Sequence, residues 1–153
     1  MKYLLFLFLM ITLSACNSDV VFSKKSEIVN ASWSYNNPVS FTFNVSDTIQ
    51  TYDLVLNIEH DVEFSNQNFY TQFTTSYPDG TEIKDVVSME LSSKYGQWLG
   101  DCNSQICDVD ILLKGSTRFK QLGDHKISIA QHTRDAVLER ISSLEFNLIK
   151  ADK

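Results

Sequence analysis

The stretch Val39-Ser40-Phe41-Thr42-Phe43-Asn44-Val45 decides the fold class, because apolar and polar side chains alternate along it. A period of two residues is typical of a strand with one buried face. Six later segments repeat it with these apolar residues: Tyr52, Leu54, Leu56 and Ile58; Phe69 and Phe73; Val87, Met89 and Leu91; Val109, Ile111 and Leu113; Ile127 and Ile129; Leu144, Phe146 and Leu148. The pattern predicts an all-β protein, a single antiparallel β-sandwich, jelly-roll or immunoglobulin-like, of about seven to eight strands.

Turn-forming residues separate these segments at Asn36-Asn37-Pro38, Pro78-Asp79-Gly80 and Gly123-Asp124. The stretch 134–141 is the one place where a helix could form, since Val137 and Ile141 share a helical face. A long hairpin connection is the alternative there.

The overall composition excludes several classes of protein. The chain has 153 residues and a net charge of -6, from thirteen Lys and Arg against nineteen Asp and Glu. With no basic surplus to neutralise phosphates, we expect no nucleic-acid partner. A hydrophobic fraction of 43% argues against intrinsic disorder of the whole chain.

The N-terminus has the pattern of a secretory signal peptide. Lys2 precedes an apolar run over residues 4–13, which ends at the small residues Ser14 and Ala15. The run is too short for a transmembrane helix, which needs about 20 apolar residues. Leu13-Ser14-Ala15-Cys16 resembles a bacterial lipobox, so Cys16 is the expected lipidation site. An ordinary cleavage site with an incidental Cys is the alternative.

These features predict three regions: a lipoprotein signal peptide (1–15), the lipidated Cys with a tether (16–32) and the β-sandwich domain (33–153). Two or three acyl chains make anchoring effectively permanent. Asn17 follows the Cys, where an Asp would resemble an inner-membrane retention signal. We therefore expect a lipid anchor in the outer membrane, on its periplasmic face.

Cys102 and Cys107 are the two cysteines left after lipidation of Cys16, and an oxidising envelope should pair them in a disulfide. Zinc is disfavoured because the C-x₄-C pair has no second pair of ligands nearby. The flanking acids Asp101, Asp108 and Asp110 do not match a calcium loop, so a solvated acidic turn is favoured over a metal site.

No catalytic, metal or cofactor site is expected. His60, His125 and His132 have no accompanying nucleophile motif, and the phosphate-binding glycine patterns are absent. The protein is therefore interpreted as a non-enzyme.

The aromatic residues offer a different function. Trp33 and Trp98, with Tyr35, Tyr77 and Tyr95, could form a platform for sugar rings. Packing in the core or against a hairpin is the favoured role for the two tryptophans, since large amphipathic rings usually pack.

Several short motifs follow one another along the chain: Val21-Phe22, Trp33, residues 39–43, Tyr52-Asp53-Leu54, residues 57–60, Tyr77-Pro78-Asp79-Gly80, residues 96–100, residues 123–132 and residues 144–149. In this order they resemble the gliding-motility lipoprotein family GldH of Bacteroidota. The insert between Cys102 and Cys107 and the pair Ser142-Ser143 depart from the family pattern.

The resemblance implies an envelope lipoprotein needed for gliding, a motility linked to type IX secretion, with other envelope proteins as partners and no catalytic residues. Asp47-Thr48-Ile49 resembles the O-glycosylation acceptor of Bacteroidota, which would place a glycan on Thr48. The sequence thus favours a non-catalytic interaction component of the gliding machinery. A carbohydrate-binding surface lipoprotein of polysaccharide uptake is the alternative.

Overall fold

The computed structural model describes residues 19–151, which form eleven strands and one short 3₁₀ turn, with no α-helix in that range. The elements in chain order are β1 (Val20–Glu27), η1 (Val29–Ala31), β2 (Ser32–Ser34), β3 (Val39–Val45), β4 (Tyr52–Asp61), β5 (Asn68–Ser76), β6 (Glu82–Glu90), β7 (Asp101–Cys102), β8 (Ile106–Thr117), β9 (Gly123–Gln131), β10 (Val137–Glu139) and β11 (Ile141–Lys150).

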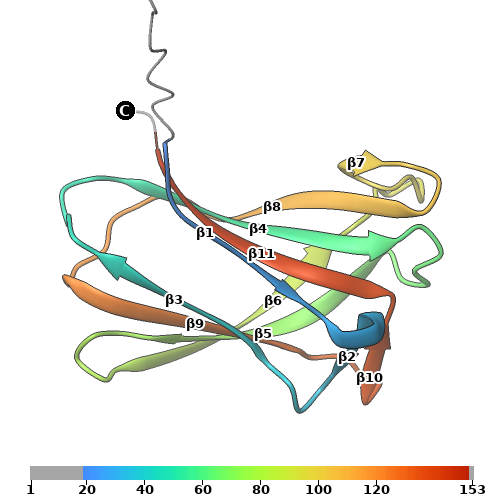
Figure 1. Ribbon diagram of the computed structural model, residues 1–153, viewed down its shortest axis with the longest axis horizontal. Helices are drawn as coiled ribbons and strands as arrows, with labels where there is room; N and C mark the ends of the chain where they lie inside the picture. Colours follow the sequence, from blue (N-terminus) through green and yellow to red (C-terminus); the bar gives the residue numbers. More distant parts are fainter. Residues whose placement is uncertain (1–18, 152–153) are drawn as a thin grey trace, which may run out of the picture.

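Two antiparallel sheets lie one above the other (Figure 1). The first has the strand order β1-β11-β4-β8-β7, and the second has the order β3-β9-β5-β6. The short strands β10 and β2 pair separately and lie at one end of the sandwich. The architecture confirms the expected all-β sandwich.

The pairing of the eight main strands distinguishes between the two kinds of sandwich that the sequence left open. The first pairs with the last (β1 with β11), the second with the second-last (β3 with β9), β4 pairs with β8, and β5 pairs with β6. This is a long antiparallel hairpin rolled into two sheets, which is the jelly-roll arrangement.

The core lies between the sheets and is rich in aromatic rings. Phe41 and Phe146 face each other from opposite sheets, with ring centroids 5.8 Å apart. Both side chains are fully buried. Phe22 on β1 covers one lateral side of this core, at 5.8 Å from Phe43 and 6.2 Å from Phe146.

All seven strands expected from the alternation are present, as β3, β4, β5, β6, β8, β9 and β11. The segment expected to be a tether, residues 16–32, contains a strand. Residues 20–27 form β1, which pairs with β11 from Val20 opposite Ile149 to Glu27 opposite Ser143. Most side chains of β1 stay exposed, so the segment lacks the alternation that marks a half-buried strand. Residues 1–15 and Cys16 lie outside the described residues.

The stretch 134–141 is not a helix. Residues Val137–Glu139 form β10, which pairs with β2, and Arg140 has a φ of 73°. Leu138 is buried while Val137 is 39% exposed, so the inward side chains follow strand geometry rather than one helical face. The hairpin connection is the correct interpretation.

Candidate functional site

One lateral side of the sandwich is left open. Its two outermost strands are β6 in one sheet and β8 in the other, and β7 covers β8 only at Cys107 and Asp108. Among residues 19–151 no strand pairs with the outer edge of β8 beyond Asp108. The opposite side, between β1 and β3, is the one that Phe22 closes.

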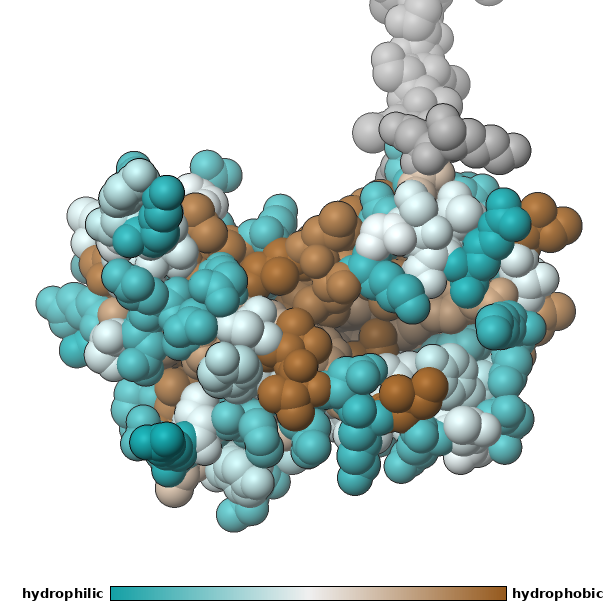
Figure 2. All heavy atoms as spheres, turned by 180° about the vertical axis from the view of Figure 1, so that it is seen from behind, coloured by the Kyte–Doolittle hydropathy of each residue, from teal (hydrophilic) through white to brown (hydrophobic). Residues whose placement is uncertain are grey.

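The inward side chains of both strands on this open side become more exposed from Met89 to Ile83 on β6 and from Val109 to Leu113 on β8. On β6, Met89 is fully buried but Ile83 is 46% exposed. On β8, Val109 is buried, whereas Ile111 and Leu113 are only partly buried. Interior positions of the sandwich therefore reach solvent here, and Figure 2 shows apolar side chains gathered in a hollow on this face.

The outer face of β8 is apolar at the same level. Leu112 points away from the core and is 60% exposed, so Ile111-Leu112-Leu113 presents apolar groups on both faces of an unpaired edge. The pairing of β8 with β4 is irregular at Leu113, and the regular open edge thus runs from Val109 to Leu112. The three consecutive apolar residues 111–113 break the alternation, and this is a signal by which the sequence could have indicated the open side.

A cleft of about 490 Å³ lies at one end of the open side. Its walls come from β3, β4, β5, β6, β8 and β9, from the β5–β6 turn and from the loop between β8 and β9. Apolar and aromatic residues in the wall include Phe43, Leu54 and Phe119, and three cations line it as well, namely Lys114, Arg118 and Lys120.

Asp79 ties the two loops beside the cleft together. Its backbone N–H donates to Gln121 Oε1 over 3.2 Å, and Gln121 Nε2 donates to Asp79 Oδ2 over 2.8 Å. Hydrogen bonds from the backbone N–H and side chain of Thr81, and from Gln121, hold the pKa of the Asp79 carboxyl below its usual range. The β5–β6 turn and the β8–β9 loop are thereby fixed relative to each other.

The disulfide lies at the opposite end of the sandwich. Cys102 and Cys107 are bonded, as expected from the sequence, and join β7 to the start of β8. The Asn103 side-chain oxygen accepts hydrogen bonds from the backbone N–H groups of Gln105 and Ile106, which shape the hairpin tip.

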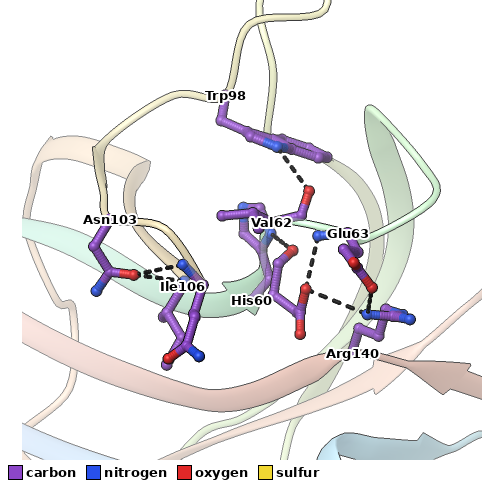
Figure 3. Close-up of polar contacts among 9 residues, drawn as sticks. His60, Val62, Glu63, Trp98, Asn103, Ile106 and Arg140 are labelled. Carbon is purple, nitrogen blue, oxygen red and sulfur yellow. Dashed lines mark hydrogen bonds and ion pairs between the residues drawn. The ribbon is translucent and has the colours of Figure 1, made fainter.

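The same end holds a polar network around the end of β4 (Figure 3). Arg140 Nη1 lies 3.3 Å from Asp61 Oδ1 and 2.8 Å from Glu63 Oε2. Asp61 Oδ1 also accepts the backbone N–H of Glu63 over 2.7 Å. The network joins the β10–β11 turn to the β4–β5 loop, and its charged groups remain largely exposed.

His60 is fully buried beneath this network, and burial lowers the pKa of its imidazole below the usual range. Its Nδ1 lies 2.8 Å from the carbonyl oxygen of Asp61, a contact that requires a proton on Nδ1. Trp98 and Phe64 pack against the ring at centroid distances of 4.7 and 5.8 Å. These contacts hold a neutral imidazole in the core rather than at an accessible reaction site.

The alternative of an aromatic platform for sugar rings is not seen at the two tryptophans. Trp33 is 1% exposed and meets Phe69 edge to face, with its Nε1–H donating to the carbonyl oxygen of Asn37. Trp98 is partly buried over His60. Tyr95 is 85% exposed. Both tryptophans therefore pack, as the favoured interpretation of the sequence had it.

Thr48 lies in the loop between β3 and β4 and is half-buried. Asp47 Oδ1 accepts the backbone N–H of Ile49 over 2.7 Å, which closes a tight turn around Thr48. Ile49 itself is 81% exposed.

Chemistry-bearing side chains do not converge in the part of the chain that the structure describes. Residues 19–151 contain no group of three or more His, Cys, Asp or Glu side chains that could hold a metal ion. No helix in the same range is long and apolar enough to cross a membrane. The open side and its cleft are features that fit binding of another molecule.

The chain is 26% identical over 155 aligned positions to a "Gliding motility lipoprotein GldH homolog" of Christiangramia forsetii, covering 97% of this chain and 94% of the relative. It is 23% identical to the "Gliding motility lipoprotein GldH" of Flavobacterium johnsoniae, covering 93% and 92%. A solved structure, the infectious bursal disease virus VP2 subviral particle, covers 86% of this chain and 34% of its own, with 16% identity and a TM-score of 0.31. The sequence model described as "GldH lipoprotein" matches residues 20–147, and the chain therefore belongs to the GldH lipoprotein family.

Proposed function

We propose that this protein is a non-catalytic lipoprotein that binds another envelope protein within the gliding machinery linked to type IX secretion. Its anchor is a lipid on Cys16, placed in the periplasmic face of the outer membrane. Family membership supports the gliding role, and the lipobox pattern before Cys16 supports the anchor.

The observation that carries the proposal is the unpaired apolar edge of β8. An exposed strand edge with apolar groups on both faces favours pairing with another strand, and natural proteins usually protect such edges with charges. The other edge of the open side has that protection, because β6 carries Glu82, Lys84, Asp85 and Glu90. Between Val109 and Leu113, Asp110 is the one charged residue of β8.

The partner is therefore an extended segment of another protein that adds to β8 as a further strand. Its backbone would pair with the edge from Val109 to Leu112, and apolar side chains would fill the hollow beside Ile111 and Leu113. Such pairing gives affinity through main-chain hydrogen bonds and specificity through the pockets for alternate side chains.

Crosslinking in living cells tests this function. A photoreactive amino acid at Leu112 should trap an envelope protein other than a lipoprotein-transport chaperone. The same amino acid at Val29, which is 79% exposed at the other end of the sandwich, should not trap it. Leu112→Glu should abolish gliding, and it should also abolish a crosslink made from Ile83 on β6, the other strand of the open side. Val29→Glu should leave both intact.

Two results would contradict the proposal. Recovery of a second copy of this chain from Leu112 would show that the edge serves self-association. Normal gliding and normal export of type IX cargo in a strain lacking the protein would remove it from the machinery. Because Leu112 is exposed, Leu112→Glu should fold normally, and circular dichroism of the purified variant checks this.

Saccharide binding has one observation in its favour, at a different place from the two tryptophans. A second hollow, of about 500 Å³, is lined by the exposed rings of Tyr35 and Tyr70 and by polar side chains that include Asn66, His132 and Arg134. Tyrosine rings with amide and charged groups suit sugar recognition. Saturable fluorescence changes with an oligosaccharide panel, lost in Tyr70→Ala and retained in Tyr95→Ala, would support this second function.

A further inference from the structure

Both ends of the described chain lie at one end of the sandwich. The backbone N–H of Lys150 donates to the carbonyl oxygen of Asp19 over 2.7 Å, and that of Ala151 donates to Thr51 over 3.0 Å. Thr117, the last residue of β8, pairs with Tyr52 at the same level. We call this the proximal end; it includes the start of β1, the β3–β4 loop and the β8–β9 loop (Figure 1).

The proximal end exposes apolar side chains on three separate segments. Ile49 in the β3–β4 loop is 81% exposed and Leu122 in the β8–β9 loop is 60% exposed. Val20 and Val21, at the start of β1, are 42% and 45% exposed. None of these side chains belongs to the open edge of β8.

Charge differs sharply between the two ends of β8. Residues 101–110, at the disulfide end, contain three acidic residues and no Lys or Arg. Residues 113–122, at the proximal end, contain three cations, Lys114, Arg118 and Lys120, and no Asp or Glu. Within residues 19–151 these cations form no ion pair. The carboxylates of Asp79 and Asp85 line the same cleft, and Asp79 accepts a hydrogen bond from Gln121.

Asn17 and Ser18 alone lie between Cys16 and Asp19, so three residue steps join the two. At about 3.5 Å per residue they span on the order of 10 Å. A lipid on Cys16 therefore keeps the proximal end within about one Debye length of the bilayer surface, where charges on the two still interact.

We propose that the proximal end is a membrane-seating face for anionic phospholipid. This rests on the proposed lipidation of Cys16. Ile49 and Leu122 enter the headgroup layer, and Arg118 and Lys120 bind lipid phosphates, while the acidic disulfide end points away from the surface. Apolar burial combined with attraction to anionic lipid is the usual basis of interfacial binding. Contact of this face with the bilayer would set the orientation of the sandwich, which a lipid anchor alone does not fix.

Fluorescence depth measurements test the seat with the full lipidated protein. A fluorophore is attached to a single cysteine introduced by Ile49→Cys or, as a matched control, by Val29→Cys, which replaces an equally exposed residue at the other end. The protein is reconstituted in vesicles of phosphatidylethanolamine and phosphatidylglycerol that contain a nitroxide-headgroup lipid. The seat predicts strong quenching of the label at position 49 and little at position 29.

Charge variants distinguish contact between the proximal end and anionic lipid from closeness to the bilayer that the lipid anchor alone would cause. Arg118→Gln with Lys120→Gln should lower quenching at position 49 severalfold, and Lys94→Gln with Arg134→Gln should leave it unchanged. Vesicles of phosphatidylcholine alone should reproduce the loss. Equal quenching at positions 49 and 29 would contradict the membrane-seating face. So would quenching at position 49 that changes neither in the Arg118→Gln, Lys120→Gln variant nor in vesicles of phosphatidylcholine. Mass spectrometry showing no lipid on Cys16 would refute the proposed anchor, and the seat with it.

Discussion

The indole N–H of Trp98 donates a hydrogen bond to the backbone carbonyl oxygen of Val62 over 3.0 Å, which ties the connection between β6 and β7 to the loop after β4 (Figure 3). The same indole lies 4.7 Å from the imidazole of His60, at an interplanar angle of 63°. Trp98 thus seals the disulfide end of the open side over a buried histidine.

Trp98→Ala should destabilise the protein by about 2–4 kcal/mol, since a large packed ring and a hydrogen bond are both lost. Trp98→Phe keeps most of the packing and should cost only about 1 kcal/mol. Urea unfolding measures both values. Tyr95→Ala is the control, because Tyr95 is 85% exposed and its loss should change stability by less than about 0.5 kcal/mol. Equal effects of the two alanine variants would contradict the role given to Trp98.

Gly100→Ala should be severely destabilising, by about 2–4 kcal/mol. Gly100 has a φ of +76°, and a Cβ there would lie 2.9 Å from the carbonyl carbon of Asp108 and overlap its oxygen. Gly80→Ala is the matched control, because Gly80 has a φ of +83° but open space around it. It should cost only the conformational penalty of about 1 kcal/mol. Thermal unfolding that ranks the two variants equally would show that the backbone at Asp108 can move aside.

Stability should fall as the pH drops below about 6.5. Burial lowers the folded-state pKa of His60 below its usual value of 6.5, so between the two values the unfolded chain binds more protons than the folded one. The stabilising effect is complete above the unfolded pKa and is lost toward the folded pKa, at no more than about 1.4 kcal/mol per pH unit. His60→Phe should flatten this dependence in urea unfolding between pH 7 and 5, whereas His132→Gln, at an exposed position, should keep it.

Reduction of the disulfide should loosen one hairpin without unfolding the domain. Cys102 and Cys107 close a ring of only six residues, for which loop entropy gives about 2 kcal/mol. Hydrogen exchange should rise in Asn103–Ile106 after reduction and stay unchanged in β9, which lies in the other sheet. Global loss of protection on reduction would mean that the bond holds the core.

The main strands could be predicted because apolar and polar side chains alternate along them, as in Val39–Val45. β1 could not be predicted in the same way, since its residues Val20, Val21 and Lys24 all face solvent and its place in the sheet comes from backbone pairing with β11. Pairing between segments this far apart leaves little trace in either one alone.

The candidate site was even less visible in the sequence. Whether Leu112 lies on a covered or an open edge depends on strand order, and strand order is a property of the whole fold. Trp33 is the opposite case, a residue that could have been exposed for sugar binding but is buried. It lies on β2, which pairs with β10 at the end of the sandwich. The disulfide was predictable, since Cys102 and Cys107 were the two cysteines left to pair.

The pairing of β1 with β11 has a mechanical consequence if Cys16 carries the proposed lipid anchor. A pull from the membrane enters at Val20 and runs along β1, and the antiparallel ladder to β11 extends from Val20 to Glu27. When the load is held at the disulfide end, this geometry shears the ladder, so its backbone hydrogen bonds share the force instead of opening one after another. With the proposed anchor in place, β1 would transmit tension into the sandwich through its pairing with β11.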